Sequence, residues 1–404
     1  MKVSVICAPE HGRNPGMATV NRAFLSLCRQ HKLGSPTFFQ LRSERYQPDY
    51  DDGVEYIDLY EHFDSAASGD RIVFWGDFLH MRSYQETMAA SIAQTRGLSL
   101  EAVRSRVRCC LLGSELLDDD LSRVVGYGGT LLLNGSRDFG DTAYRTDLSR
   151  LTAGARYWAV RDPFSAFQVS ALMEGSGSAH VCCDAALHLK GVTGGAEATA
   201  LEYGSAVANR LGVFFGRSDR ADLGGHLRLV RYLGHRLGFR PTWIPWLSKG
   251  SVALSRRLRP KLWKVFKERS RFAQEAHQGR ADLKLQQLSE CSLVVTDTYH
   301  VAVNSWRLGI PAVCVGKFVS ARPSDVSSGP QFEWIDKRFT FFLPYLLGRF
   351  YVHSTELLSR QTAAHRIDDI VMAFEDPAVI AAALGRIDAH RQRSEMLLVE
   401  ALRE

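Results

Sequence analysis

The sequence lacks the patterns by which many compartments and structural sites are recognised. Its eight cysteines include no C-x-x-C pair, and most of them lie in apolar runs, where cysteine acts as a small core residue. We therefore expect a reducing compartment, without a disulfide framework or a structural zinc site. No apolar run reaches the roughly 18 residues that span a bilayer, and the apolar stretch at 3–8 is too short for a signal peptide. These absences predict a cytoplasmic protein.

Familiar catalytic motifs are missing as well. The sequence contains no H-x-x-x-H, H-E-x-x-H or carboxylate triad with metal-ligand spacing, and no G-x-S-x-G, G-x-x-x-x-G-K or G-x-G-x-x-G after a strand. We accordingly expect neither a metal ion nor a cofactor. The net charge of +6 suits a partner that carries phosphate or carboxylate, but this excess is too small to predict nucleic-acid binding.

The chain has the length and pattern of two α/β domains. Its 404 residues, 45 % of them hydrophobic, can form two cores of about 150–200 residues each. Short apolar runs alternate with helix-length segments, as in parallel sheets covered on both faces. The predicted strands are 3–8, 71–76, 107–113, 130–134, 156–161, 211–216, 291–296 and 310–316, and the predicted helices are 17–30, 222–238, 299–308 and 377–402.

A Gly-rich segment at 191–196 is the best candidate for a linker. We expect two doubly wound, Rossmann-like domains, 1–195 and 196–404, the second of which includes the C-terminal helix. Such halves place ligands in the cleft between them, beyond the carboxyl ends of their strands.

The segment 243–271 stands apart because basic residues dominate it and aromatic residues interrupt them. Such a stretch can lie on an anionic membrane or bind a lipid-linked phosphate. It is equally typical of a solvated basic face whose aromatic side chains pack on the domain. Peripheral contact with the inner face of a membrane is therefore one of two hypotheses for this segment.

The most informative segment runs from 294 to 313. A buried strand ends at Thr296, a polar turn follows, and a helix begins that carries His300 in its first turn and stops at Gly309. We expect the ring of His300 at the mouth of the interdomain cleft. The amino end of the helix favours an anion there, and a histidine beside a phosphate can hold its charge and transfer a proton.

Two further segments place polar residues at strand ends. Arg161 follows the strand 156–161, where a guanidinium can hold a phosphate or carboxylate bidentately. Asp162 and Ser165 fit the capping of the next helix. The turn from Asn14 to Gly16 can cradle an anion at a helix start, although Asn-Pro-Gly is first of all a turn former.

These segments resemble the polysaccharide pyruvyltransferase family. The family has a strand, then Ser/Thr-Arg-x-His-Ala, a helix, Gly-x-Pro and a strand. This chain is similar at His300, at Gly309-Ile310-Pro311 and, one place displaced, at Ala302. It departs from the family at Thr298, where the family usually has Arg, so that the charge of an anionic donor must be met elsewhere.

Four more matches support the resemblance. The family's Arg-Asp/Glu-x-x-Ser pattern corresponds to 161–165, and its strand-to-Asp segment corresponds to 181–186, which contains Asp184. The family often has Arg where this chain has Arg217. Its Asn/Gly-rich turn corresponds to 12–17, without the Asp that often follows there.

The resemblance implies a GT-B-like fold, with the acceptor side in 1–195 and the donor side in 196–404, and a defined activity. The family transfers a pyruvyl group from phosphoenolpyruvate to two hydroxyls of a sugar in a polysaccharide or glycolipid, and it forms a cyclic ketal without a metal. It implies His300 as general acid or phosphate partner. The implied donor-binding residues are Arg161, Arg217, Thr298, Lys317, Asn14 and Gly16, with Arg322 as a further substitute for the missing arginine.

Two other interpretations remain open from the sequence. A GT-B glycosyltransferase that uses a nucleotide sugar would share the fold. The absence of glutamate between Glu290 and Glu333 disfavours the retaining members that carry two glutamates eight residues apart, but it does not disfavour inverting ones. The departures at Thr298 and in the first turn also fit a degenerate, non-catalytic member of the family.

Overall fold

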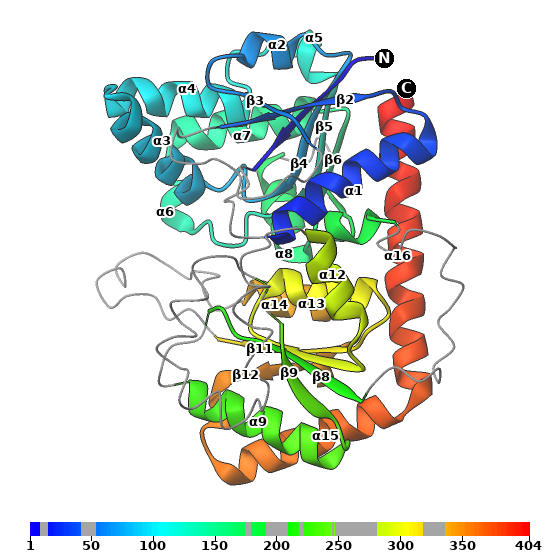
Figure 1. The fold of residues 1–404 in the computed structure, drawn as a ribbon. Coiled ribbons are helices and arrows are strands. Elements are labelled where there is room, and N and C mark those ends of the chain that lie inside the picture. Colours follow the sequence, from blue (N-terminus) through cyan, green and yellow to red (C-terminus); the bar gives the residue numbers. More distant parts are fainter. Residues whose placement is uncertain are drawn as a thin grey trace.

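Two parallel sheets, one from each half of the chain, form the framework of the molecule (Figure 1). The computed structural model describes residues 1–8, 15–41, 54–173, 179–190, 209–217, 222–244, 246, 281–317 and 336–404. Both sheets have helices on their two faces, as Figure 1 shows. The expected α/β fold with two doubly wound sheets is confirmed.

The first sheet has the strand order β3-β2-β1-β4-β5-β6-β7. Its strands are Val3–Cys7 (β1), Pro36–Gln40 (β2), Tyr56–Asp58 (β3), Arg71–Asp77 (β4), Val124–Gly129 (β5), Tyr157–Val160 (β6) and His180–Val181 (β7). The chain winds outward from β1 in one direction and from β4 in the other. The carboxyl ends of β1 and β4 therefore flank the switch point of the sheet, where doubly wound folds bind ligands.

Helices cover this sheet on both sides. They are Pro15–His31 (α1), Phe63–Ala67 (α2), Arg82–Arg96 (α3), Leu100–Leu112 (α4), Asp118–Leu121 (α5), Ser136–Phe139 (α6), Thr142–Gly154 (α7), Pro163–Leu172 (α8) and the 3₁₀ helix Ala185–His188 (η1). Strands β1, β4 and β5 are buried almost throughout, because a parallel sheet covered on both faces needs apolar residues on both.

The second sheet has the order β12-β11-β10-β8-β9. Its strands are Arg210–Phe214 (β8), Arg240–Trp243 (β9), Leu293–Thr296 (β10), Ala312–Gly316 (β11) and Tyr351–His353 (β12). The switch point lies between β8 and β10, so the segments that follow Phe214 and Thr296 meet there. The helices are Leu223–Arg236 (α9), Ala281–Ser289 (α12), Tyr299–Arg307 (α13), Lys337–Phe342 (α14), Gly348–Phe350 (η4), Ser354–Leu357 (η5), Arg360–Glu375 (α15) and Pro377–Arg403 (α16).

Two predicted strands are wrong. Residues 107–113 form the end of α4, because Val103, Val107 and Leu111 recur at helical spacing and are all buried. Gly113 ends that helix with a φ of +59°, and its N–H donates to the carbonyl of Cys109. An apolar run of this length does not distinguish a strand from the end of a buried helix.

Residues 130–134 form a loop, and the strand lies just before them, at β5. The backbone leaves the sheet after Gly129, and the N–H of Leu131 donates to Ser165 Oγ at 2.8 Å rather than to a neighbouring strand. The strand itself was missed because its sequence, VVGYGG, contains three glycines, which lower strand propensity.

Helix α16 leaves the second half and runs along the first (Figure 1, red). Asp376 caps it and Pro377 begins it. At its far end, Ser394 Oγ accepts a hydrogen bond from the N–H of Cys183 at 3.0 Å, and Glu395 accepts one from Gln30 at 2.6 Å. No helix in the described parts of the chain combines enough length and apolarity to cross a membrane.

The eight cysteines are all free and buried, as their apolar surroundings in the sequence predict. The expected linker at 191–196 and the boundary at 195 lie outside the described residues. So does most of the basic segment 243–271. Of its aromatic residues, Trp246 is fully buried and Trp243 is half-buried, which fits aromatic side chains packed on the domain.

Candidate functional site

The amino ends of α1 and α13 bring the two halves of the chain into contact. Gly16 lies against the side chain of His300: a Cβ at position 16 would be 2.4 Å from both Cβ and Cγ of that histidine. One helical turn further along, Asn304 Nδ2 donates to Thr19 Oγ1 at 3.2 Å. Two residues that the sequence assigned to the same site, Gly16 and His300, therefore touch.

His300 is buried in this contact rather than open to solvent, with 6 % of its surface exposed. Burial lowers the pKa of its imidazole to about 4, against the opposing effect of Asp77 and Asp184. The ring is therefore neutral at pH 7. Nδ1 is buried without a hydrogen-bond partner among the described residues. A neutral imidazole accepts a proton, which favours a general base over the general acid expected from the sequence.

The start of α13 is not capped by a side chain. Thr298 is the N-cap residue, but its hydroxyl donates to Asp297 Oδ1 at 3.0 Å instead of accepting from the helix. Asp297 in turn accepts from the backbone N–H groups of Gly216 and Arg217, at 2.7 and 2.9 Å. An uncapped amino end keeps N–H groups that can bind an anion.

Arg161 lies at the centre of the site and is itself buried. Its guanidinium lies 3.4 Å from Asp77 Oδ1 and 3.5 Å from Asp184 Oδ2, and it stacks over the ring of Tyr299 at 4.8 Å. Burial alone would lower its pKa, but Tyr299, Asp77 and Asp184 raise it overall. With its charge already met by two carboxylates, Arg161 is better placed to position them than to hold a donor alone.

Tyr299 joins the halves a second time. It comes from α13 in the second half, and its hydroxyl donates to Asp184 Oδ2 in the first half at 2.8 Å. Arg161, Asp184 and His300, which come from three separate motifs of the sequence, thus meet in one cluster. Together with Asp77, Tyr299 and Lys337 they are referred to below as the central cluster.

Asp77 was not identified from the sequence, although a signal existed. It is the last residue of β4, at the switch point of the first sheet, directly after the predicted strand 71–76. Both Gly76 and Asp77 have positive φ, of +73° and +48°. Such a backbone is uncommon for a residue other than glycine, and it turns the chain at the strand end, where Asp77 pairs with Arg161.

Lys337 was also missed. It begins α14, half-buried, and its ammonium lies 4.4 Å from the centre of the Phe78 ring. Burial lowers the pKa of Lys337 to about 8, opposed by Asp77 and assisted by Arg161 and Arg217. The lysine therefore remains mostly protonated at pH 7. No pattern marks it in the sequence, because the residues before it show neither strand nor helix periodicity.

The remaining predicted residues are distributed less compactly. Arg217 is exposed at the end of β8, near enough to influence Lys337. The ammonium of Lys317 lies 2.9 Å from Asp222 at the edge of the second sheet. Asp162 caps α8, with its carboxylate accepting from the N–H of Ser165 at 2.8 Å, as expected. Asn14 and Arg322 lie outside the described residues.

The central cluster combines groups suited to transfer chemistry. It offers a neutral imidazole that accepts a proton, a protonated ammonium that can stabilise a leaving anion, and a buried arginine that fixes two carboxylates. These groups come from both halves and lie at the carboxyl edges of the two sheets. In the described part of the chain, no group of three or more His, Cys, Asp or Glu residues is arranged to hold a metal ion.

Known structures share this architecture. A UDP-GlcNAc 2-epimerase from Neisseria meningitidis, solved bound to UDP-GlcNAc, matches with a TM-score of 0.51 and 9 % identity, over 100 % of this chain and 99 % of that one. A trehalose-6-phosphate synthase matches with a TM-score of 0.50 and 12 % identity, over 100 % and 99 %. Both have the GT-B fold, and at these identities the likeness establishes the fold of this chain. No protein-family model and no curated protein matches the sequence.

Proposed function

We propose that this chain is a GT-B glycosyltransferase that moves a sugar from a nucleotide-sugar donor to a hydroxyl of a sugar acceptor, with inversion at the reacting carbon. One observation carries the proposal: the central cluster joins a neutral histidine and a cationic lysine from the second half to the carboxylate–arginine group of the first. Reactive groups thus face one another where the two sheets end, which is where doubly wound folds bind ligands.

The protonation states support a direct displacement. The acceptor hydroxyl attacks the anomeric carbon of the donor and gives its proton to the imidazole of His300. The bond from that carbon to the phosphate oxygen breaks, and its electron pair leaves with the nucleotide diphosphate. Lys337 and the uncapped amino end of α13 stabilise the negative charge that forms on the leaving group.

The buried carboxylates assist the histidine. Asp77 and Asp184 both favour the protonated form of His300, so they stabilise the imidazolium that forms as the hydroxyl loses its proton. Arg161 holds the two carboxylates in place from 3.4 and 3.5 Å. Arg161 is therefore proposed as a positioning residue, and His300 as the residue that touches the acceptor.

Pyruvyl transfer from phosphoenolpyruvate is the second candidate, and a specific observation favours it. Arg161, Asp184 and His300 are the residues that carry the resemblance to the polysaccharide pyruvyltransferases, and they meet in the central cluster. In this reaction a proton is delivered to the methylene carbon of the donor while a hydroxyl adds to the carbon beside it. The second hydroxyl then displaces phosphate. Lys337, which is protonated at pH 7, is a better proton donor for this step than the neutral ring of His300.

Donor binding separates the candidates. We would record melting curves of the full chain with UDP-glucose, UDP-GlcNAc, GDP-mannose and phosphoenolpyruvate, because a ligand that binds the folded state raises the melting temperature. A nucleotide sugar should do so, and release of its nucleotide diphosphate with acceptor present should follow. Stabilisation by phosphoenolpyruvate alone would select the pyruvyltransferase candidate. If no donor binds, the chain is a non-catalytic member of this fold.

A further inference from the structure

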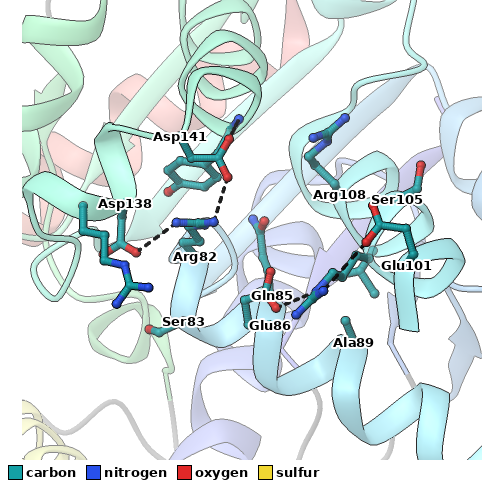
Figure 2. A pocket seen from close by; sticks show the side chains of 14 residues that line it. Arg82, Ser83, Gln85, Glu86, Ala89, Glu101, Ser105, Arg108, Asp138 and Asp141 are labelled. Atoms are coloured by element: carbon teal, nitrogen blue, oxygen red, sulfur yellow. Dashed lines mark hydrogen bonds and ion pairs between the residues drawn. The ribbon is translucent and has the colours of Figure 1, made fainter. Parts of the chain in front are cut away.

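A cavity separate from the central cluster lies in the first half of the chain. It has a volume of about 640 Å³, within the usual range of ligand sites, and it is enclosed by α3, α4 and the segment that leads from α6 into α7. We call it the three-helix groove (Figure 2). Its walls carry Arg82, Glu86, Arg104, Arg108, Asp138 and Asp141.

Ion pairs connect the three walls to one another. Each pair takes its two partners from different helices or their caps. The nitrogen–oxygen distances are 2.7 Å for Arg82–Asp141, 2.8 Å for Arg104–Glu86 and 2.9 Å for Arg108–Asp147. Figure 2 marks the Arg82–Asp141 pair with a dashed line. The three ion pairs therefore link the walls to one another, and the opposite charges within each pair cancel.

The chemistry of these walls selects a ligand class. All of the paired side chains remain partly exposed, from 19 % for Asp147 to 44 % for Arg104. A guanidinium has more donors, and a carboxylate more acceptors, than one ion pair uses. The groove thus presents donors and acceptors side by side without net charge. That suits hydroxyl groups, which donate and accept, and it disfavours an anion, because a carboxylate stands in each pair.

The groove begins at the same sheet edge as the central cluster. Arg82 is the first residue of α3 and follows Asp77, the end of β4, by five positions. Its backbone N–H donates to Asn134 Oδ1 at 3.2 Å, which ties the start of α3 to the loop after β5. The groove therefore starts at the edge of the first sheet where β4 ends, the edge that also carries Asp77.

We propose that the three-helix groove binds a neutral oligosaccharide and holds the part of the acceptor that is remote from the reacting hydroxyl. The proposal rests on the proposed function for the identity of the reacting end. Binding in the groove depends on the groove's own ion pairs. It can therefore be measured without donor and without turnover.

The test uses the full chain and three neutral probes: maltohexaose, cellohexaose and chitohexaose. Binding is measured by calorimetry and by saturation-transfer NMR, with no donor present. Ser105, an exposed residue of the lining on α4, is changed to Trp to obstruct the groove without touching an ion pair. Gln94→Trp, on an exposed position of α3 outside the lining, is the matched control.

A second variant tests the wall chemistry. Arg104→Gln removes the Arg104–Glu86 pair, and Arg210→Gln removes a similarly exposed pair, Arg210–Glu290 at 2.7 Å, in the second half. At least one hexasaccharide should bind the parent, and Ser105→Trp and Arg104→Gln should weaken it about 10-fold or more, the effect of one hydrogen bond to a charged group. The two controls should bind as the parent does, and melting curves should show all four variants folded.

The outcomes also separate this proposal from the proposed function. If turnover occurs but long acceptors have the same KM as monosaccharides in parent and variants alike, the groove is not an acceptor site. If no hexasaccharide binds the parent, the proposal is overturned, whatever the enzyme does. If a hexasaccharide binds and Ser105→Trp abolishes it, while no donor is ever turned over, the groove stands and the proposed function fails.

Discussion

Gly16 and His300 touch across the two halves of the chain, so closely that residue 16 has no room for a side chain. A Cβ there would lie 2.4 Å from the Cβ and Cγ of His300. The φ of Gly16 does not require glycine, since it lies in the first turn of α1. Space alone therefore explains the glycine, and the position of the proposed base depends on it.

Replacing Gly16 should lower activity without unfolding the protein. Alanine is a better helix former than glycine by about 0.5–1 kcal/mol, but at this position its methyl group must displace the ring of His300. Because a shift of about 1 Å in a reacting group can cost about 100-fold in rate, kcat of Gly16→Ala should fall by about 10-fold or more. Gly224→Ala is the matched control, since it is also the second residue of a helix and a Cβ there meets no described atom within 4 Å. Equal kcat in the two variants would contradict the proposed place of His300.

His300→Gln should reduce turnover by about 10²–10⁴-fold, as expected on loss of a general base. Because the ring is 6 % exposed, the substitution also affects packing, so the rate must be normalised to folded protein from a melting curve. Glutamine keeps much of the volume and removes the basic nitrogen. A variant that melts early but turns over normally per folded molecule would identify His300 as a structural residue.

The pH profile of kcat/KM should be bell-shaped. Activity requires neutral His300, so it should rise as pH increases through about 4; it also requires protonated Lys337, so it should fall as pH increases through about 8. Lys337→Arg should move the alkaline limb upward, and an unmoved limb would show that another group titrates there. Stability should also decline as pH falls from 6.5 toward 4, because unfolded histidine binds a proton before folded His300 does.

Arg161 should matter for folding more than an exposed arginine does. Arg161→Met leaves the carboxylates of Asp77 and Asp184 buried without their cation, which typically costs about 3–5 kcal/mol. Arg236→Met breaks an ion pair with Asp368 whose side chains are both about half exposed, and such pairs contribute about 0–1 kcal/mol. Urea unfolding of the two variants measures the difference, and similar losses of free energy of unfolding would contradict a buried, charge-balancing role.

Lys337→Met should weaken donor binding by about 10-fold or more while leaving the acceptor KM unchanged. Two side chains of the central cluster are cationic. Arg161 is enclosed by two carboxylates, whereas the ammonium of Lys337 lies over the ring of Phe78. Arg217→Met, a change to an exposed neighbour, serves for comparison and should have a smaller effect. Each variant is titrated with the donor that stabilises the parent, which gives its dissociation constant for that donor. A larger loss of affinity in Arg217→Met would assign the donor-binding role to Arg217.

The alternation of strands and helices was predictable because each buried strand is a short apolar run between polar turns. The clearest case is 291–316, where β10, α13 and β11 all lie where the sequence places them. Local pattern failed at 107–113, since Val-Arg-Cys-Cys-Leu-Leu fits a buried strand as well as the last turns of α4. The local pattern also failed at β5. Gly126, Gly128 and Gly129 lower the strand propensity of this central strand, which is buried by the elements around it.

The candidate site was predictable only where a residue follows a recognisable strand or motif. Arg161, Gly16 and His300 were named as candidate site residues in this way, and Asp184 as part of a segment that matches the family. Their partners were not, because pairing depends on which strand ends are adjacent: Asp77 lies in a different segment from Arg161, and only the order β4-β5-β6 brings them together. The burial of His300, which lowers the pKa of its ring, likewise depends on the approach of Gly16 in α1 and not on its own segment.

Helix α16 has a consequence for how the protein is made. Its last turns complete the surface of the first half: Glu395 bonds Gln30, 365 positions away, and Ser394 bonds the backbone of Cys183. The ring of His188, completely buried in the finished protein, has Glu395 beside it. The first half precedes α16 in the chain, so it emerges during synthesis before the helix that covers this flank. Because domains begin to fold as they emerge, this half begins to fold with that flank uncovered, and α16 covers it only afterwards.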